Sequence, residues 1–339
     1  MAPPSSDPVE RGWELLEVGD FDGADACLRK AKRDDPDDAE VLCLAGAITA
    51  ARGEVDEALE ILARAAEADP EYAHPLLQAG ELELYSRGDA VAARALAERA
   101  LAVAQGDEEE ADALLLRAEA ELEEEDGDRP ARATMLAIDR LDLADPVLLT
   151  RAGNMYLALD EMRRAERAFL AAIELDAAQA DAHHGLGLVY EERGDHEAMV
   201  KAWLDTRRLD AAAPEPPWHL DHAEFERIAE AAMEELPDEV LTRLENVPIL
   251  VEDLPGEDLV TEGYDPRLLG LFSGVPLPDK SHVTGQSPVI DSVHLYQRNL
   301  ERHSADPDEL AEEIRITVIH ETAHFFGLDD DDLEELGLG

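Results

Sequence analysis

The sequence predicts an α-solenoid of paired helices, followed by a small α/β domain that combines helices with a few strands. Three observations carry this prediction. Glycine recurs with a 34-residue period through much of the first 210 residues, a proline-rich stretch ends the periodicity, and short apolar segments then precede one long helical segment. A period of about 34 residues is typical of stacked helix pairs. Short apolar runs between Gly, Pro and Asp residues are typical of strands.

The periodic part is built on small residues at a constant spacing. Gly12, Gly46 and Gly80 lie 34 residues apart, and Gly153 and Gly187 repeat that step. Other positions keep the same spacing, namely Ala24 and Ala58, Leu28 and Leu62, Ala31 and Ala65, and Pro36 and Pro70. This is the tetratricopeptide pattern, in which small residues let two antiparallel helices pack closely.

We expect about six helix pairs over residues 9–210, after a disordered start at residues 1–8. The pair that begins near Thr150 shows the fullest pattern, whereas the fourth pair is degenerate, with an expanded turn at Asp126-Gly127-Asp128. Stacked pairs leave a concave face free. We therefore predict that the array binds a protein or peptide; a spacer or an oligomerisation arm is the alternative, and the sequence indicates no oligomeric state.

The chain is strongly acidic, with a formal net charge of −52. Such a field repels phosphate backbones and anionic membranes, so nucleic acid and membrane partners are not expected, while cations and basic peptides are attracted. Genomic bias or a salty cytoplasm is the alternative reason for this composition. The opening residues lack a secretion signal and no apolar run is long enough to span a membrane, which predicts a cytoplasmic protein. Cys27 and Cys43 are expected to be small core residues.

The second domain is expected at residues 221–339, after a linker at residues 211–220 that Pro214, Pro216 and Pro217 stiffen. An amphipathic helix opens the domain at Asp221, which is spaced from Glu224 as a capping box. Three extended segments follow, at residues 247–253, 268–276 and 287–297. They predict a small mixed sheet.

The last predicted helix runs from Pro307 to Phe326, because Asp306 can cap its start and Gly327 can end it. It carries His320-Glu321-Thr322-Ala323-His324. Side chains four residues apart on a helix point the same way, so His320 and His324 can hold one zinc ion from the same side. Glu321 is rotated by about 100° from His320, which suits a general base that hydrogen-bonds a water on the metal.

A third protein ligand is needed, and few positions can supply it. The candidates are the acids after Gly327 and an upstream histidine such as His282 or His294. Asp330 is the preferred candidate, because it lies six residues past His324, just after the helix end, in the spacing H-E-x-x-H-x-x-G-x-x-D. The neighbouring acids Asp329, Asp331 and Asp332 are more typical of a solvated run.

Residues 222–336 resemble the small bacterial zincin-like metallopeptidase family. The resemblance lies in FERIAEAAMEELPDEVLTRLENVPILVED, LLGLFSGVPL, VHLYQRNL and ELAEEIRITVIHETAHFFGLDDDDLEELG. It implies a minimal α/β zincin in which His320, His324 and Asp330 bind zinc and Glu321 is the catalytic acid/base.

These observations predict a zinc metalloendopeptidase that hydrolyses peptide bonds with a metal-activated water, while the repeats recruit a protein substrate or partner. A peptide could add to the strand at residues 268–276, where Gly270 and Gly274 allow close approach, although a glycine-weakened core strand is an equal reading. Tyr296 or His294 could donate to the oxyanion. The alternative function is a non-proteolytic interaction scaffold whose zincin-like domain only binds metal. A structural zinc site is a weaker option, because this domain has no cysteine.

Overall fold

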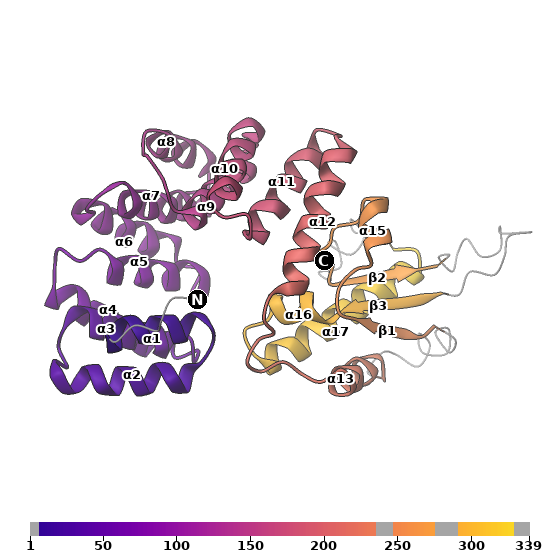
Figure 1. Ribbon diagram of the computed structural model, residues 1–339, viewed down its shortest axis with the longest axis horizontal. Helices are drawn as coiled ribbons and strands as arrows, with labels where there is room; N and C mark the ends of the chain where they lie inside the picture. Colours follow the sequence, from indigo (N-terminus) through magenta and orange to yellow (C-terminus); the bar gives the residue numbers. More distant parts are fainter. Residues whose placement is uncertain (1–6, 235–246, 275–290, 329–339) are drawn as a thin grey trace, which may run out of the picture. The chain divides into compact units, whose positions relative to one another are not determined.

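The computed structural model describes residues 7–234, 247–274 and 291–328. Its internal contacts divide the chain into two compact units, residues 1–195 and 196–339 (Figure 1). The first unit is helical, and the second combines helices with a three-stranded sheet. The predicted fold class, an α-solenoid followed by a small α/β domain, is confirmed.

The first unit is a stack of helix pairs. The pairs are α1 (Pro8–Glu17) with α2 (Phe21–Asp34), α3 (Ala39–Ala50) with α4 (Val55–Ala68), α5 (His74–Glu81) and its π-helical continuation η1 (Leu82–Ser86) with α6 (Ala90–Val103), α7 (Asp107–Leu122) with α8 (Asp128–Ile138), and α9 (Pro146–Ala158) with α10 (Met162–Leu175); α11 (Ala180–Glu192) follows. Each helix packs on its pair partner, and the first helix of each pair also packs on the first helix of the next. The first helices therefore line the inner face of the stack, as expected for tetratricopeptide repeats.

The periodic glycines are required because the helices approach closely. A Cβ atom at Gly153 would lie 2.4 Å from the ring of Phe169, and one at Gly185 would lie 2.3 Å from the same ring. Equivalent contacts occur between Gly12 and Leu44, Gly46 and Leu62, and Gly80 and Leu116. Contacts this short exclude any larger residue unless the neighbouring helix shifts.

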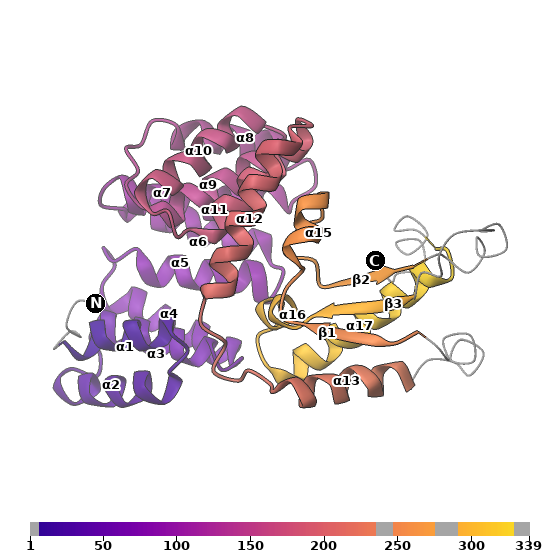
Figure 2. The ribbon, with the colours of Figure 1, turned by 45° about the vertical axis from the view of Figure 1, so that its right-hand side comes forward.

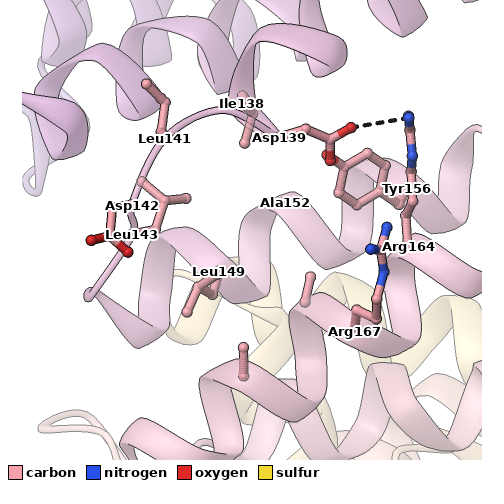
Figure 3. Close-up of a pocket in the computed structure, with 12 residues that line it drawn as sticks. Ile138, Asp139, Leu141, Asp142, Leu143, Leu149, Ala152, Tyr156, Arg164 and Arg167 are labelled. Carbon is pink, nitrogen blue, oxygen red and sulfur yellow. Dashed lines mark hydrogen bonds and ion pairs between the residues drawn. The ribbon is translucent and has the colours of Figure 1, made fainter.

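The degenerate fourth pair is held by polar contacts around its loops. Figure 3 shows a hollow of about 270 Å³ beside the segment that joins α8 to α9. At its edge the Tyr156 hydroxyl donates to Asp139 at 2.9 Å, and Arg164 pairs with Asp139 at 3.0 Å. The Arg164 guanidinium also lies 5.6 Å from the centre of the Tyr156 ring. These side chains satisfy one another and tie the linker to α9 and α10.

The second unit begins with a helix of the repeat pattern. Its elements are α12 (His196–Ala212), α13 (His222–Glu234), β1 (Ile249–Glu252), α15 (Glu257–Glu262), β2 (Gly270–Ser273), β3 (Ser292–Tyr296), α16 (Gln297–His303) and α17 (Pro307–Phe325). The sheet order is β1-β3-β2, with β1 parallel and β2 antiparallel to β3. The predicted mixed sheet is confirmed.

Helices α13 and α17 cover one face of this sheet (Figure 2). Val293 and Leu295 of β3 are fully buried against Phe225 of α13 and against Ile314 and Val318 of α17. Successive strand residues point to opposite faces. The even-numbered residues of β3, from position 292 to position 296, therefore point away from α17.

Helix α12 is joined to the rest of the second unit by a buried ion cluster. Asp210 is only 2% exposed. Its carboxylate accepts from Arg267 Nε at 2.9 Å and Nη2 at 3.2 Å, and from Arg302 Nη2 at 2.6 Å. Helix α12 also packs on α15. The periodicity places α12 with the array, in the predicted range 9–210, whereas its contacts group it with the C-terminal unit.

None of the helices within the described ranges has the length and apolar character needed to cross a bilayer.

Candidate metal centre

The helix that carries the His-Glu motif begins and ends close to the predicted positions. Asp306 Oδ1 accepts from the backbone N–H groups of Asp308 and Glu309, both at 2.9 Å, which caps α17. Pro307 is the first helical residue, and Gly327 follows the helix with a φ of 84°. The predicted helix 307–326 is observed as Pro307–Phe325.

The two motif histidines converge on one point. His320 Nε2 and His324 Nε2 lie 3.1 Å apart, and both side chains are half-buried. Two nitrogens bound to a tetrahedral zinc ion at about 2.0–2.1 Å would lie ~3.3 Å apart. The observed separation therefore suits two ligands of one ion and needs little rearrangement.

His324 is oriented by the chain that follows the helix. Its Nδ1 lies 2.9 Å from the Leu328 carbonyl oxygen. A ring that donates from Nδ1 presents the lone pair of Nε2 to a metal, which is the usual outer-shell arrangement of a metal-binding histidine. This partner is a backbone atom, so no side chain in the sequence indicates it; only the turn at Gly327 hints that the chain folds back.

Glu321 lies under the edge of the sheet. It is 7% exposed, and its Oε2 accepts from the Phe272 backbone N–H at 2.6 Å. Tyr296 N–H donates to the Leu269 carbonyl at 2.9 Å, and antiparallel pairs alternate, so the Phe272 N–H points away from β3. Glu321 thus occupies a donor at the outer edge of β2.

Gly270 is the place where α17 meets the sheet. A Cβ atom at this position would lie 2.7 Å from Thr317 Cγ2 and 2.9 Å from Glu321 Cγ. The glycine therefore lets α17 and its base approach β2, which is a packing role beside the predicted one of admitting a peptide. Gly274, at the far end of β2, has Asp291 Oδ1 at 2.4 Å from where its Cβ would be.

Comparison with known families agrees with this geometry. Residues 244–339 match the model of the zincin-like metallopeptidase family, and residues 9–73 and 147–179 match models of the tetratricopeptide repeat. The chain carries tetratricopeptide repeats and a zincin-like metallopeptidase domain. No curated protein matches the chain.

Two solved structures illustrate the similarity. PilF of Pseudomonas aeruginosa is 17% identical, with a TM-score of 0.46, over 61% of this chain and 91% of that one. A tetratricopeptide protein of Thermus thermophilus is 20% identical, with a TM-score of 0.45, over 54% of this chain and 96% of that one.

The third ligand of the zincin-like domain stays a prediction. Asp330, its acidic neighbours and His282 lie outside the described residues. Within residues 7–234, 247–274 and 291–328, no three His, Cys, Asp or Glu side chains form a group that could hold a metal. The described part of the domain thus supplies two imidazoles and one carboxylate base.

His294 has other partners. Its Nδ1 lies 3.1 Å from Glu252 Oε2 and its Nε2 lies 3.0 Å from Ser292 Oγ. It belongs to the sheet face that points away from α17, so the structure does not bring it to His320 and His324.

Tyr296 is the other predicted oxyanion donor of the zincin-like domain. It is 1% exposed at the end of β3. Burial, with the charges of Glu252 and Glu321, raises the pKa of its hydroxyl, which keeps the proton at neutral pH. No contact recorded among the described residues joins its hydroxyl to the histidine pair, and its role as a donor stays a prediction.

Proposed function

We propose that the zincin-like domain is a zinc-dependent peptidase and that the tetratricopeptide repeats recruit its protein substrate. The observation that carries the proposal is the pair of Nε2 atoms 3.1 Å apart on α17, with a buried glutamate between them in the sequence. A domain that only stored a metal would not need a base at this position. We also infer that the protein acts in the cytoplasm.

His320 and His324 would hold the ion, with Asp330 as the proposed third protein ligand. Zinc, when bound, would activate the attacking water and polarise the scissile carbonyl. Glu321 would take a proton from that water and pass it to the leaving amine. To do so its carboxylate must exchange the Phe272 N–H for the water, and its burial favours that proton transfer by excluding bulk solvent.

The substrate would lie along the outer edge of β2, near Gly270 and Gly274. In the sheet order β1-β3-β2, the described strands leave this edge of β2 without a neighbouring strand. An extended peptide can pair with such an edge through main-chain hydrogen bonds. Its scissile bond would then pass over Glu321, which already reaches the same edge.

The experiment measures zinc and cleavage on the same preparations. Purified full-length protein should hold one zinc per chain and cleave a denatured protein library. Glu321→Gln should keep the zinc and lose at least 100-fold in activity, because general-base catalysis contributes about 10²–10⁴-fold. Glu312→Gln is the matched control, since Glu312 is an exposed carboxylate of the same helix, paired with Arg315.

Two results would contradict the proposal. Equal activity of wild type and Glu321→Gln would mean that the cleavage comes from another site or a contaminant. Full zinc occupancy without any cleavage would favour the non-proteolytic scaffold. Zinc content of His320→Ala and Asp330→Asn, compared with Asp332→Asn, tests the ligand set independently of activity.

A further inference from the structure

The inner face of the repeat stack contains a hollow of about 260 Å³ between its second and third pairs. Its lining comes from α3, α4, α5 and η1, namely Ala47, Ala50, Leu62, Gln78, Glu81, Leu82, Tyr85 and Ser86. Leu62 is buried, so it forms the floor. The hollow has an apolar interior and a polar rim, which is the usual composition of a small recognition pocket.

The rim carries an exposed aromatic ring. Tyr85 is 65% exposed, and its hydroxyl donates to Glu119 Oε2 of α7 at 2.8 Å. It lies in η1, the π-helical segment that continues α5. Such π-bulges occur frequently at functional sites. The hydrogen bond fixes the ring while one face of it stays open to a ligand.

The charge around the hollow is negative. Arg151 of α9 is shared by three carboxylates: Glu81 at 3.5 Å, Asp112 at 2.6 Å and Glu119 at 2.7 Å. Helices α3 and α5 and the segment η1 contain Glu40, Glu81 and Glu83 and no lysine or arginine. The nearby carboxylates therefore exceed the cations, and Glu81 makes the longest of the three ion pairs with Arg151.

We propose that this hollow binds a segment of the protein partner in which an aliphatic side chain lies next to a lysine or arginine. The aliphatic side chain enters the hollow above Leu62, and the cation lies between Glu81 and the open face of Tyr85. A cation on an aromatic ring beside a carboxylate gains from both groups. An acidic or phosphate-bearing ligand would be repelled. The proposal rests on the recruiting role of the repeats and is independent of catalysis.

The test measures binding of fluorescein-labelled peptides to the full-length protein by anisotropy, at a salt concentration of about 150 mM. The probe is a Gly/Ser peptide of about 12 residues that contains two adjacent Leu-Lys pairs. Its matched controls replace both leucines by serine or both lysines by glutamate. We expect the Leu-Lys peptide to bind at least tenfold more tightly than either control. Equal binding of the Leu-to-Ser peptide would reduce the interaction to diffuse charge and overturn the proposal.

Two variants locate the site. Glu81→Gln removes the carboxylate, and Ala50→Leu fills the hollow; each should weaken the Leu-Lys peptide at least tenfold. Glu60→Gln, an exposed change of equal charge on the outer helix α4, should leave the affinity unchanged. Circular dichroism melts show whether each variant is folded.

An equal loss with Glu60→Gln, or none with the other two variants, would refute the site. Loss of a dimer on Ala50→Leu, seen by sedimentation, would instead assign the hollow to a second copy and overturn the proposal. All binding measurements are repeated in a Glu321→Gln background without added zinc. Failure of the peptidase proposal therefore leaves this result readable.

Discussion

Replacing Asp210 by asparagine tests whether α12 is an integral part of the C-terminal unit. The carboxylate is 2% exposed and accepts three hydrogen bonds from Arg267 and Arg302. Removing one partner of a buried ion pair costs ~3–5 kcal/mol, because the other charges stay buried without compensation. Arg302 is 38% exposed and keeps part of its hydration, so we expect the lower end, about 3 kcal/mol.

The measurement is urea unfolding followed by tryptophan fluorescence. Trp203 and Trp218 lie in the second unit and Trp13 in the first, so a Trp13→Phe background reports the second unit alone. A loss of about 3 kcal/mol also lowers the melting temperature by ~6–12 °C for a unit of this size. The control is Asp205→Asn, an exposed ion-paired residue of α12, with an expected effect below ~0.5 kcal/mol. A cost of less than about 1 kcal/mol for Asp210→Asn would refute the buried-cluster argument.

Three further outcomes are expected. Gly270→Ala should cost ~1–3 kcal/mol of unfolding free energy in urea titrations, because its Cβ would lie 2.7 Å from Thr317 Cγ2, and an added Thr317→Ser change should recover part of it. Burial raises the pKa of Glu81 from 4.5 to about 7, so wild type should lose stability as pH rises from 4.5 to 7. Glu81→Gln should therefore gain on the order of 1 kcal/mol relative to wild type at pH 8 and nothing at pH 4, a value reduced for the exposure of this side chain; equal effects at both pH values would contradict this. Burial raises the pKa of Cys43 to about 12, so mass spectrometry after iodoacetamide treatment at pH 8 should find Cys27 alkylated first.

The helices were predictable because their signals are local. Asp306, Pro307 and Gly327 mark the ends of α17 within a few residues of chain, and the structure has the helix within one residue of the predicted end. The periodic glycines likewise record contacts between neighbouring helices, as Gly153 does with Phe169. Tetratricopeptide pairs were predictable for the same reason, since each pair contacts only its neighbours.

The contacts that arrange the candidate site are not local. Glu321 meets the Phe272 N–H across 49 residues, and Asp210 meets Arg302 across 92. No periodicity reports such pairs. For His294, alternation along the strand predicts that it points away from Val293, but only the packing of α17 determines which face holds the metal centre. The His-Glu motif was predictable because helical spacing alone brings its two imidazoles together.

The hydrogen bond from Phe272 to Glu321 has a consequence for the order of events in the proposed reaction. A peptide that docks along β2 offers its own carbonyl to that N–H and so competes with the carboxylate for a single donor. Arrival of the peptide and release of the carboxylate then become one exchange. In the absence of a peptide the carboxylate would stay engaged with the strand, so an idle enzyme would be slow to act on water alone.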